Sequence, residues 1–274
     1  MRLRAPLRRF AGPAGALAAA LALALACGAA GPEAGKERAL RFFATRVPSA
    51  DPGWAAIFGY LHRRFGVEAT SARGAPLHLP APVSERPEVA AVYRRLFDPA
   101  ATAAPEQIAA LPTAVDRMTA LALHCDRIAL PPDFADALRR ATELGGYALT
   151  HAALAGQWTL ENGCADFAQL RELQAEQVER LAILAGDRTG IGASHEAGYD
   201  VWIEALAMLH YLGAGSRVRA EWLAELLASQ RGDGGWSRSP REDRSDPHAT
   251  ALALWVLLET LEPGARPVPF VPSF

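Results

Sequence analysis

The sequence has little of several features that would indicate a particular chemistry. It contains three cysteines and three methionines among 274 residues, and only 8% of its residues are aromatic. Its formal net charge is −2, so it lacks the strongly basic character that nucleic-acid binding needs. It also contains no nucleophile elbow, no phosphate-binding glycine loop and no His-Glu-x-x-His sequence. These absences exclude the most easily recognised hydrolase, nucleotide-binding and metalloprotease classes.

The chain also lacks an apolar run long enough to span a bilayer as a helix, although an apolar segment lies near its start. The run over 14–26 has about 13 residues, whereas a spanning helix needs about 20. Four arginines precede it, as is typical of an export signal. The segment 23–28, LALACG, resembles a bacterial lipobox, in which the cysteine, here Cys27, is acylated. The alternative is ordinary signal cleavage near residues 29 and 30.

The two remaining cysteines suit an oxidising compartment. With Cys27 acylated, Cys125 and Cys164 remain as a pair, and the sequence leaves two alternatives open, the first of which is a disulfide across the first helical hairpin. Two buried thiols acting as small apolar residues are the alternative. A zinc site that combines these cysteines with His124 and His151 is disfavoured. His124 and Cys125 are adjacent on one helix, so their side chains point about 100° apart.

The chain divides into five segments by composition. We expect a lipoprotein-type signal peptide over 1–26, a polar tether over 27–36, N-terminal helices with a proline-rich connection over 37–104, a helical repeat domain over 105–262 and a tail over 263–274. Short helices are expected within 38–46 and 52–66, and the proline-rich segment 70–87 is expected to be extended. From Pro105 onward the 3.6-residue apolar period predicts helices over 105–127, 132–143, 145–161, 165–185, 196–212, 218–230 and 247–261.

Three of these segments look like copies of one unit. They cover 147–163, 199–213 and 249–261, their starts lie about 50 residues apart, and a more polar helix follows each of the first two. A period in this range is typical of stacked αα-hairpins. The sequence therefore predicts an all-α fold of stacked αα-hairpins that form a partial α/α toroid, open unless the N-terminal helices complete it.

One stretch between the last two helices resembles a known repeat. Gln230, Asp233, Gly234, Gly235 and Trp236 are similar to the QW-type repeat of the squalene-hopene and oxidosqualene cyclases and the protein prenyltransferase β-subunits, which are toroids of paired helices. The resemblance covers the C-terminal part of the chain only. It implies that the glutamine and the tryptophan tie one helical hairpin to the next.

The first turns of the inner helices hold the candidate site residues. In an αα-toroid these turns surround the mouth of the central cavity, at the positive ends of the helix dipoles. Asp246 and His248 are the candidate catalytic residues. The candidate binding-pocket residues are His195, Glu196, Asp200 and Trp236.

The resemblance implies two chemistries, and the residues fit neither completely. Prenyltransferase β-subunits hold zinc with Asp, Cys and His, and Asp200 and His248 match two of these, but no cysteine lies near Asp200. The cyclases use Asp-x-Asp-Asp-Thr-Ala, which falls in register with 246–251, but His248 replaces the proton-donating aspartate. The structural alternative is that Asp246 caps the last helix and His248 is a polar neighbour. No cofactor is therefore predicted, with zinc as the alternative.

The function predicted from the sequence is that of an exported helical-repeat lipoprotein with a degenerate cyclase-like or prenyltransferase-like toroid. Its concave face is expected to bind an apolar small molecule, a peptide or an envelope protein, and lipidated Cys27 to hold it on a bacterial membrane facing the periplasm or the exterior. The alternative is an enzyme of the same superfamily that acts on an isoprenoid or another lipid. A common fold does not decide between the two.

Overall fold

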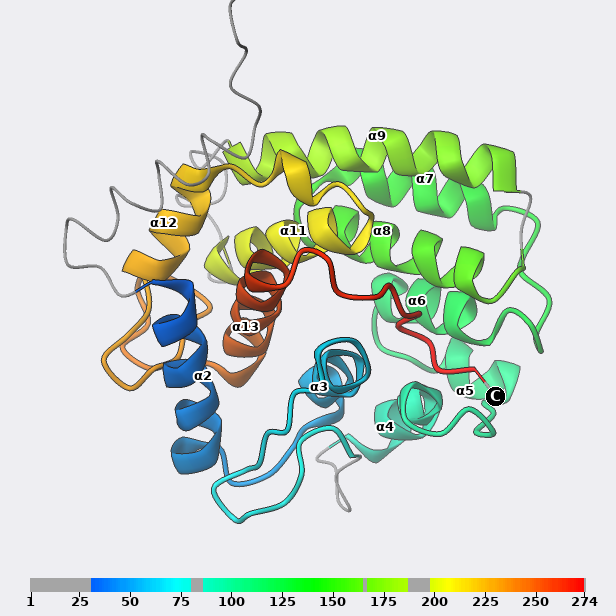
Figure 1. Cartoon of the computed structure of the whole chain (residues 1–274). Coiled ribbons are helices and arrows are strands. Elements are labelled where there is room, and N and C mark those ends of the chain that lie inside the picture. Colours follow the sequence, from blue (N-terminus) through cyan, green and yellow to red (C-terminus); the bar gives the residue numbers. More distant parts are fainter. Residues whose placement is uncertain (1–30, 80–85, 165–166, 187–197, 274) are drawn as a thin grey trace, which may run out of the picture.

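The protein is all-α over the residues that the structure, a computed structural model, describes: 31–79, 86–164, 167–186 and 198–273 (Figure 1). In these ranges there is no strand, and the β-type pairings are two isolated bridges, Thr70 with Pro76 and Trp236 with Asp246. None of the described helices is both long and apolar enough to cross a membrane. The helices are α2 Pro32–Arg46, α3 Pro52–Phe65, α4 Pro87–Tyr93, η1 Arg94–Leu96, α5 Pro105–Ala109, α6 Ala114–His124, α7 Phe134–Leu144, α8 Gly146–Glu161, α9 Phe167–Gly186, α11 Gly198–Tyr211, η2 Gly215–Arg217, α12 Ala220–Ala228 and α13 Pro247–Leu261.

The helices pack in a circuit. α6 contacts α8, α8 contacts α11, α11 contacts α13, and α13 contacts α3, while α4 contacts both α3 and α6. At the periphery, α7 packs on α8, α9 packs on α8 and α11, and α2 packs on α13 (Figure 1). The three copies seen in the sequence are α8, α11 and α13, which are neighbours in this circuit. α13 is buried almost throughout, because it contacts α11, α3 and α2 at once.

The N-terminal part of the described chain contains more helix than the sequence predicted. α2 begins at Pro32, so most of the expected polar tether over 27–36 that the structure describes is helical. Proline at the first helical position and Glu33 in the first turn favour this start. Gly35 allows α2 to approach its neighbours closely, since a Cβ there would lie 2.9 Å from Leu227 Cδ2.

The prediction of one helix over 105–127 was wrong, and the helices within 87–96 were not predicted. The single helix predicted over 105–127 is two helices, α5 and α6, because Pro112 interrupts the pattern and Thr113 starts a new helix by accepting a hydrogen bond from Asp116 N at 2.9 Å. No helix was predicted within 88–104, yet α4 and η1 occupy 87–96. Only Val89 and Val92 are buried in α4, too few to produce a recognisable period.

Gln230 joins three parts of the chain at the end of α12. Its Nε2 donates hydrogen bonds to Gly35 O at 2.9 Å and Gly234 O at 2.8 Å, and its Oε1 accepts one from Arg38 Nη2. Gly234 has a φ of 95°, and a Cβ there would lie 2.3 Å from Arg38 O. The turn therefore needs glycine so that it can pack against α2.

We expect replacement of Gln230 by alanine to lower the free energy of unfolding by about 2 to 3 kcal/mol, because Gly35 and Gly234 lose hydrogen-bond donors and α2 loses its link to the turn. Urea unfolding followed by circular dichroism measures this loss. The matched control is Gln169→Ala at an exposed position of α9, for which a change below about 0.5 kcal/mol is expected. Equal effects of the two substitutions would contradict a bridging role for Gln230.

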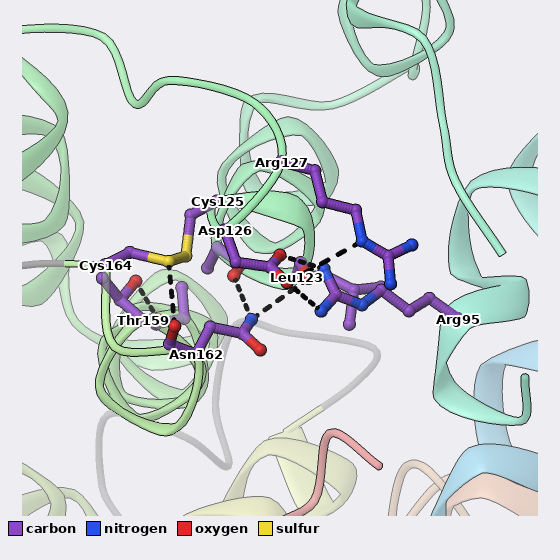
Figure 2. Close-up of a disulfide and its surroundings, with 10 residues drawn as sticks. Arg95, Leu123, Cys125, Asp126, Arg127, Thr159, Asn162 and Cys164 are labelled. Carbon is purple, nitrogen blue, oxygen red and sulfur yellow. Dashed lines mark hydrogen bonds and ion pairs between the residues drawn. A yellow bond between two sulfur atoms is a disulfide. The ribbon is translucent and has the colours of Figure 1, made fainter. Parts of the chain in front are cut away.

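Cys125 and Cys164 form a disulfide with their Cα atoms 5.9 Å apart, which decides between the two alternatives that the sequence left open (Figure 2). The bond joins the C-terminal ends of α6 and α8. Asn162 Nδ2 reinforces the junction by donating to Ala122 O at 2.9 Å, and Arg95 from η1 donates to Leu123 O at 2.6 Å. Arg95 also forms a two-pronged ion pair with Asp126, one arm of which measures 2.7 Å.

Candidate functional site

The N-terminal turns of α11 and α13 lie side by side and bring Asp200 and His248 together. His248 Nδ1 lies 3.0 Å from Asp200 Oδ1 and 3.2 Å from Oδ2. Asp200 is 1% exposed, whereas the His248 side chain is 27% exposed. The two helix starts adjoin because α11 and α13 pack against each other.

Arg238 is the third charged residue of this cluster, and it was not predicted from the sequence. Its Nη2 lies 3.4 Å from Asp200 Oδ2, and its backbone oxygen accepts hydrogen bonds from the amides of Tyr199 and Asp200, each at 3.0 Å. The carbonyl thus caps the first turn of α11 while the guanidinium neutralises the carboxylate. No local pattern marks Arg238, because its loop reaches α11 only through tertiary folding.

A second acid lies one turn further along α11. Glu204 is 4% exposed, and its Oε1 lies 3.3 Å from His151 Nδ1 on α8. Within the described part of the chain, Glu204 Oε2 is buried and has no hydrogen-bond partner. A signal for Glu204 was present in the sequence: it is the one charged residue within 201–209, and it follows Asp200 by four positions, on the same helix face.

Burial and charge divide these groups into an ionised pair and a neutral pair. Burial would lower the pKa of His248, but the Asp200 carboxylate, with Glu204 and Asp246 nearby, outweighs it and raises the pKa to about 9. Burial would raise the pKa of Asp200, yet His248 and Arg238 together hold it below its usual value. Burial raises the pKa of Glu204 to about 8 and lowers the pKa of His151 to about 4. At neutral pH, Asp200 and His248 are charged, while Glu204 and His151 are uncharged.

We expect the free energy of unfolding to fall as pH rises from about 6.5 to 9. The pKa of His248 is raised on folding, so its stabilising effect is complete below the unfolded value near 6.5 and is lost as pH passes about 9. Glu204 acts in the same direction up to about pH 8, because the folded chain retains a proton that the unfolded chain releases. Below pH 6.5, protonation of His151 in the unfolded chain opposes Glu204.

Urea unfolding at pH 6.5, 8 and 9 tests this dependence. The His248 contribution is on the order of 3 kcal/mol over the range. His248→Gln, which keeps an amide donor for Asp200, should make the decline between pH 8 and 9 smaller and leave the part that is due to Glu204. Constant stability of the unmodified chain across the range would contradict the assignment.

The other predicted site residues have different positions. Asp246 caps α13, with Oδ1 accepting from Ala249 N at 3.0 Å, which is the structural alternative considered for it. Trp236 does not lie at an open pocket as predicted: it is fully buried, and its Nε1 donates to Leu226 O at 2.8 Å. The apolar indole is needed to cover the end of the core there. His195, Glu196 and Cys27 lie outside the described residues.

Asp200, Asp246 and His248 lie close enough together to hold a metal ion, each offering a ligand atom within 4.8 Å of the others. Their present partners do not suit a zinc ion. Both Asp200 oxygens face cations, His248 and Arg238, and Asp246 Oδ1 accepts the helix-capping hydrogen bond. A divalent ion here would be repelled by Arg238 and would find no thiolate ligand. The residues therefore fit an internal salt-bridge cluster better than a metal site.

Comparisons with protein-family models, with curated proteins and with solved structures find no match to this chain.

Proposed function

We propose that this chain is an exported lipoprotein, held on a bacterial membrane through Cys27, that binds an apolar ligand, a peptide or an envelope partner at the inner face of an α/α toroid. The observation that carries the proposal is the disulfide between Cys125 and Cys164. Disulfides persist in oxidising compartments, and this one agrees with the arginine-rich, apolar leader at the start of the sequence.

The toroid is supported by the circuit of helix contacts and by the Gln230 bridge. Helix contacts run from α6 through α8, α11, α13 and α3 to α4 and return to α6. Gln230 connects the turn before α13 to α2, which is the role that the glutamine has in the QW-type repeat. Both observations favour a degenerate member of the cyclase and prenyltransferase superfamily.

The state of the ionic cluster favours binding over catalysis. Asp200 is almost fully buried and is neutralised on two sides by His248 and Arg238. A general acid or base must reach a substrate atom within hydrogen-bonding distance, and a carboxylate saturated by internal partners is poorly placed to do so. The cluster instead joins α11 to α13 and to the loop before α13.

Fractionation of the native host tests the proposal. The full chain should partition with membranes, and mass spectrometry should show an acylated N-terminus at Cys27. The variant Cys27→Ser should be released into the soluble exported fraction with its Cys125 to Cys164 disulfide intact. A cytoplasmic chain with reduced cysteines would contradict the proposal.

One observation favours a second candidate, an enzyme acting on an isoprenoid or another lipid. Glu204 is a buried carboxylic acid with a pKa near 8, so it holds a transferable proton at neutral pH next to the Asp200 and His248 pair. Raised carboxyl pKa values are typical of general acids. Conversion of an isoprenoid or another lipid by the purified chain, lost in Glu204→Gln, would establish this candidate. Absence of turnover would leave the binding proposal.

A further inference from the structure

The C-terminal tail crosses the middle of the helix circuit instead of extending into solvent. After α13 it has no regular secondary structure, and in Figure 1 it runs in red from α13 past α8 and α6. Phe270 and Val271 are 4% and 3% exposed, whereas Pro263, Gly264 and Arg266 are exposed. The tail is therefore buried mainly at Phe270 and Val271, and Arg64 Nη1 also donates to Arg266 O at 3.4 Å.

Phe270 occupies a cage of four aromatic rings from separate parts of the chain. Its ring stacks on Tyr60 of α3 with centroids 5.0 Å apart and an interplanar angle of 16°. The centroids of Trp158 on α8, Trp255 on α13 and Tyr211 at the end of α11 lie 5.6, 5.8 and 5.9 Å away. Both tryptophans are buried, and their rings contact the ring of Phe270. The cage is formed by the inner helices and filled by a segment that belongs to none of them.

Two charged side chains hold the tail backbone at the same point. Glu161 Oε2 accepts hydrogen bonds from the amides of Phe270 at 3.0 Å and Val271 at 3.1 Å, while its Oε1 accepts from Tyr211 at 2.6 Å. Arg63 Nη2 donates to Phe270 O at 2.6 Å. These groups suit recognition of an extended peptide. The carboxylate accepts hydrogen bonds from two backbone amides, the guanidinium donates one to a backbone carbonyl, and the cage holds the intervening side chain.

The tail can leave this position without disturbing a helix. Residues 262–273 belong to no helix, so their movement would unwind none. Prolines at 267, 269 and 272 restrict its backbone, so an extended segment of this kind loses less conformational entropy on binding. Its departure would expose the four aromatic rings and leave Glu161 and Arg63 without their backbone partners, and a similar segment would restore those contacts.

We propose that the aromatic cage, with Glu161 and Arg63, is a binding site for an extended peptide segment that carries a phenylalanine between a proline and an apolar residue, and that the tail fills this site as an internal competitor. The ligand is a segment of another protein with the chemistry of residues 269–271. This inference rests on the proposed binding function and names its ligand class. An outside segment must displace the tail in order to bind.

The test cleaves the chain at an exposed position before the tail. A specific protease site is inserted between Pro263 and Gly264 in the full chain, and the protein is cut, separated from the tail and checked by circular dichroism. A fluorescently labelled peptide of residues 264–274 should then bind the cut protein saturably. The uncut chain should bind the same peptide at least about a hundredfold more weakly, because its own tail occupies the cage.

Variants of the peptide distinguish specific binding in the cage from non-specific binding. Phe270→Ala in the peptide should weaken binding by about a hundredfold or more, because the cage loses its ring. The matched control, Arg266→Ala, alters an exposed side chain whose residue contacts the body through its carbonyl, and should change affinity less than about threefold. Equal binding of both variant peptides, or equal binding to cut and uncut protein, would overturn the inference.

Two further outcomes distinguish this inference from the proposed function. If the cut protein remains folded and takes up an apolar naphthalene sulfonate dye but not the peptide, the peptide inference fails and binding of an apolar ligand stands. If the cut protein loses its helical signal, the tail is a core element and the inference is overturned. In that case Phe270→Ala in the uncut chain should unfold the protein as well.

Discussion

Replacing Asp200 by asparagine is expected to lower the free energy of unfolding by about 3 to 5 kcal/mol at pH 7, because the variant leaves His248 and Arg238 without their shared counter-charge. The pKa of His248 should fall at the same time, since the Asp200 carboxylate is the main group that raises it. Urea unfolding measures the first effect, and proton NMR of the histidine ring measures the second.

The neighbouring acid provides the matched control. Glu204→Gln, one turn along the same helix, should change the free energy of unfolding by less than about 1 kcal/mol at pH 7, because Glu204 is already uncharged there and glutamine has the same shape. Similar losses in the two variants would show that Glu204 is ionised and that the division into charged and neutral pairs is wrong. The contrast depends on charge alone, since each substitution exchanges one oxygen for an amide nitrogen.

Removing the disulfide is expected to cost about 4 kcal/mol of unfolding free energy, because the bond closes a loop with a sequence separation of 39 and so restricts the unfolded chain. The variant carries Cys125→Ser and Cys164→Ser together, which avoids a lone reactive thiol. Urea unfolding of the variant beside the oxidised parent measures the loss.

A reductant gives the control for this prediction. It should destabilise the parent to the level of the double variant and leave the variant itself unchanged. The junction should otherwise persist, because Asn162 and Arg95 still bond to the carbonyls at the end of α6. A parent chain as unstable as the variant before reduction would contradict a stabilising role for the bond.

The helices were largely predictable from the sequence, because helix formation depends on local patterns. Asp246 followed by Pro247 is a local start signal, and α13 begins and ends as predicted. The break at Pro112 was also local and was overlooked because the apolar residues on each side continue in a similar period. α4 was not predictable in this way, since its burial depends on packing against α3, α5 and α6.

The candidate site was only partly predictable. Asp200 and His248 belong to the first turns of repeated helices, so the repeat itself indicated that they lie near each other. Trp236 belongs to the QW-type stretch, but the sequence alone did not show whether its side chain is buried in the core or lines a pocket. Arg238 and His151 reach the cluster from a loop and from another helix, and neither position has a sequence signal for this contact.

The sequence by itself determined the all-α class, most helix positions and the presence of a cysteine pair suited to an oxidising compartment. These depend on periodicity, capping residues and composition, which act over a few neighbouring residues. Only the tertiary structure decided that Glu204 meets His151, and that Phe270 of the tail enters a cage formed by α3, α8, α11 and α13. Such contacts join residues far apart in the chain, and their free energy depends on burial and on partners that no local pattern specifies.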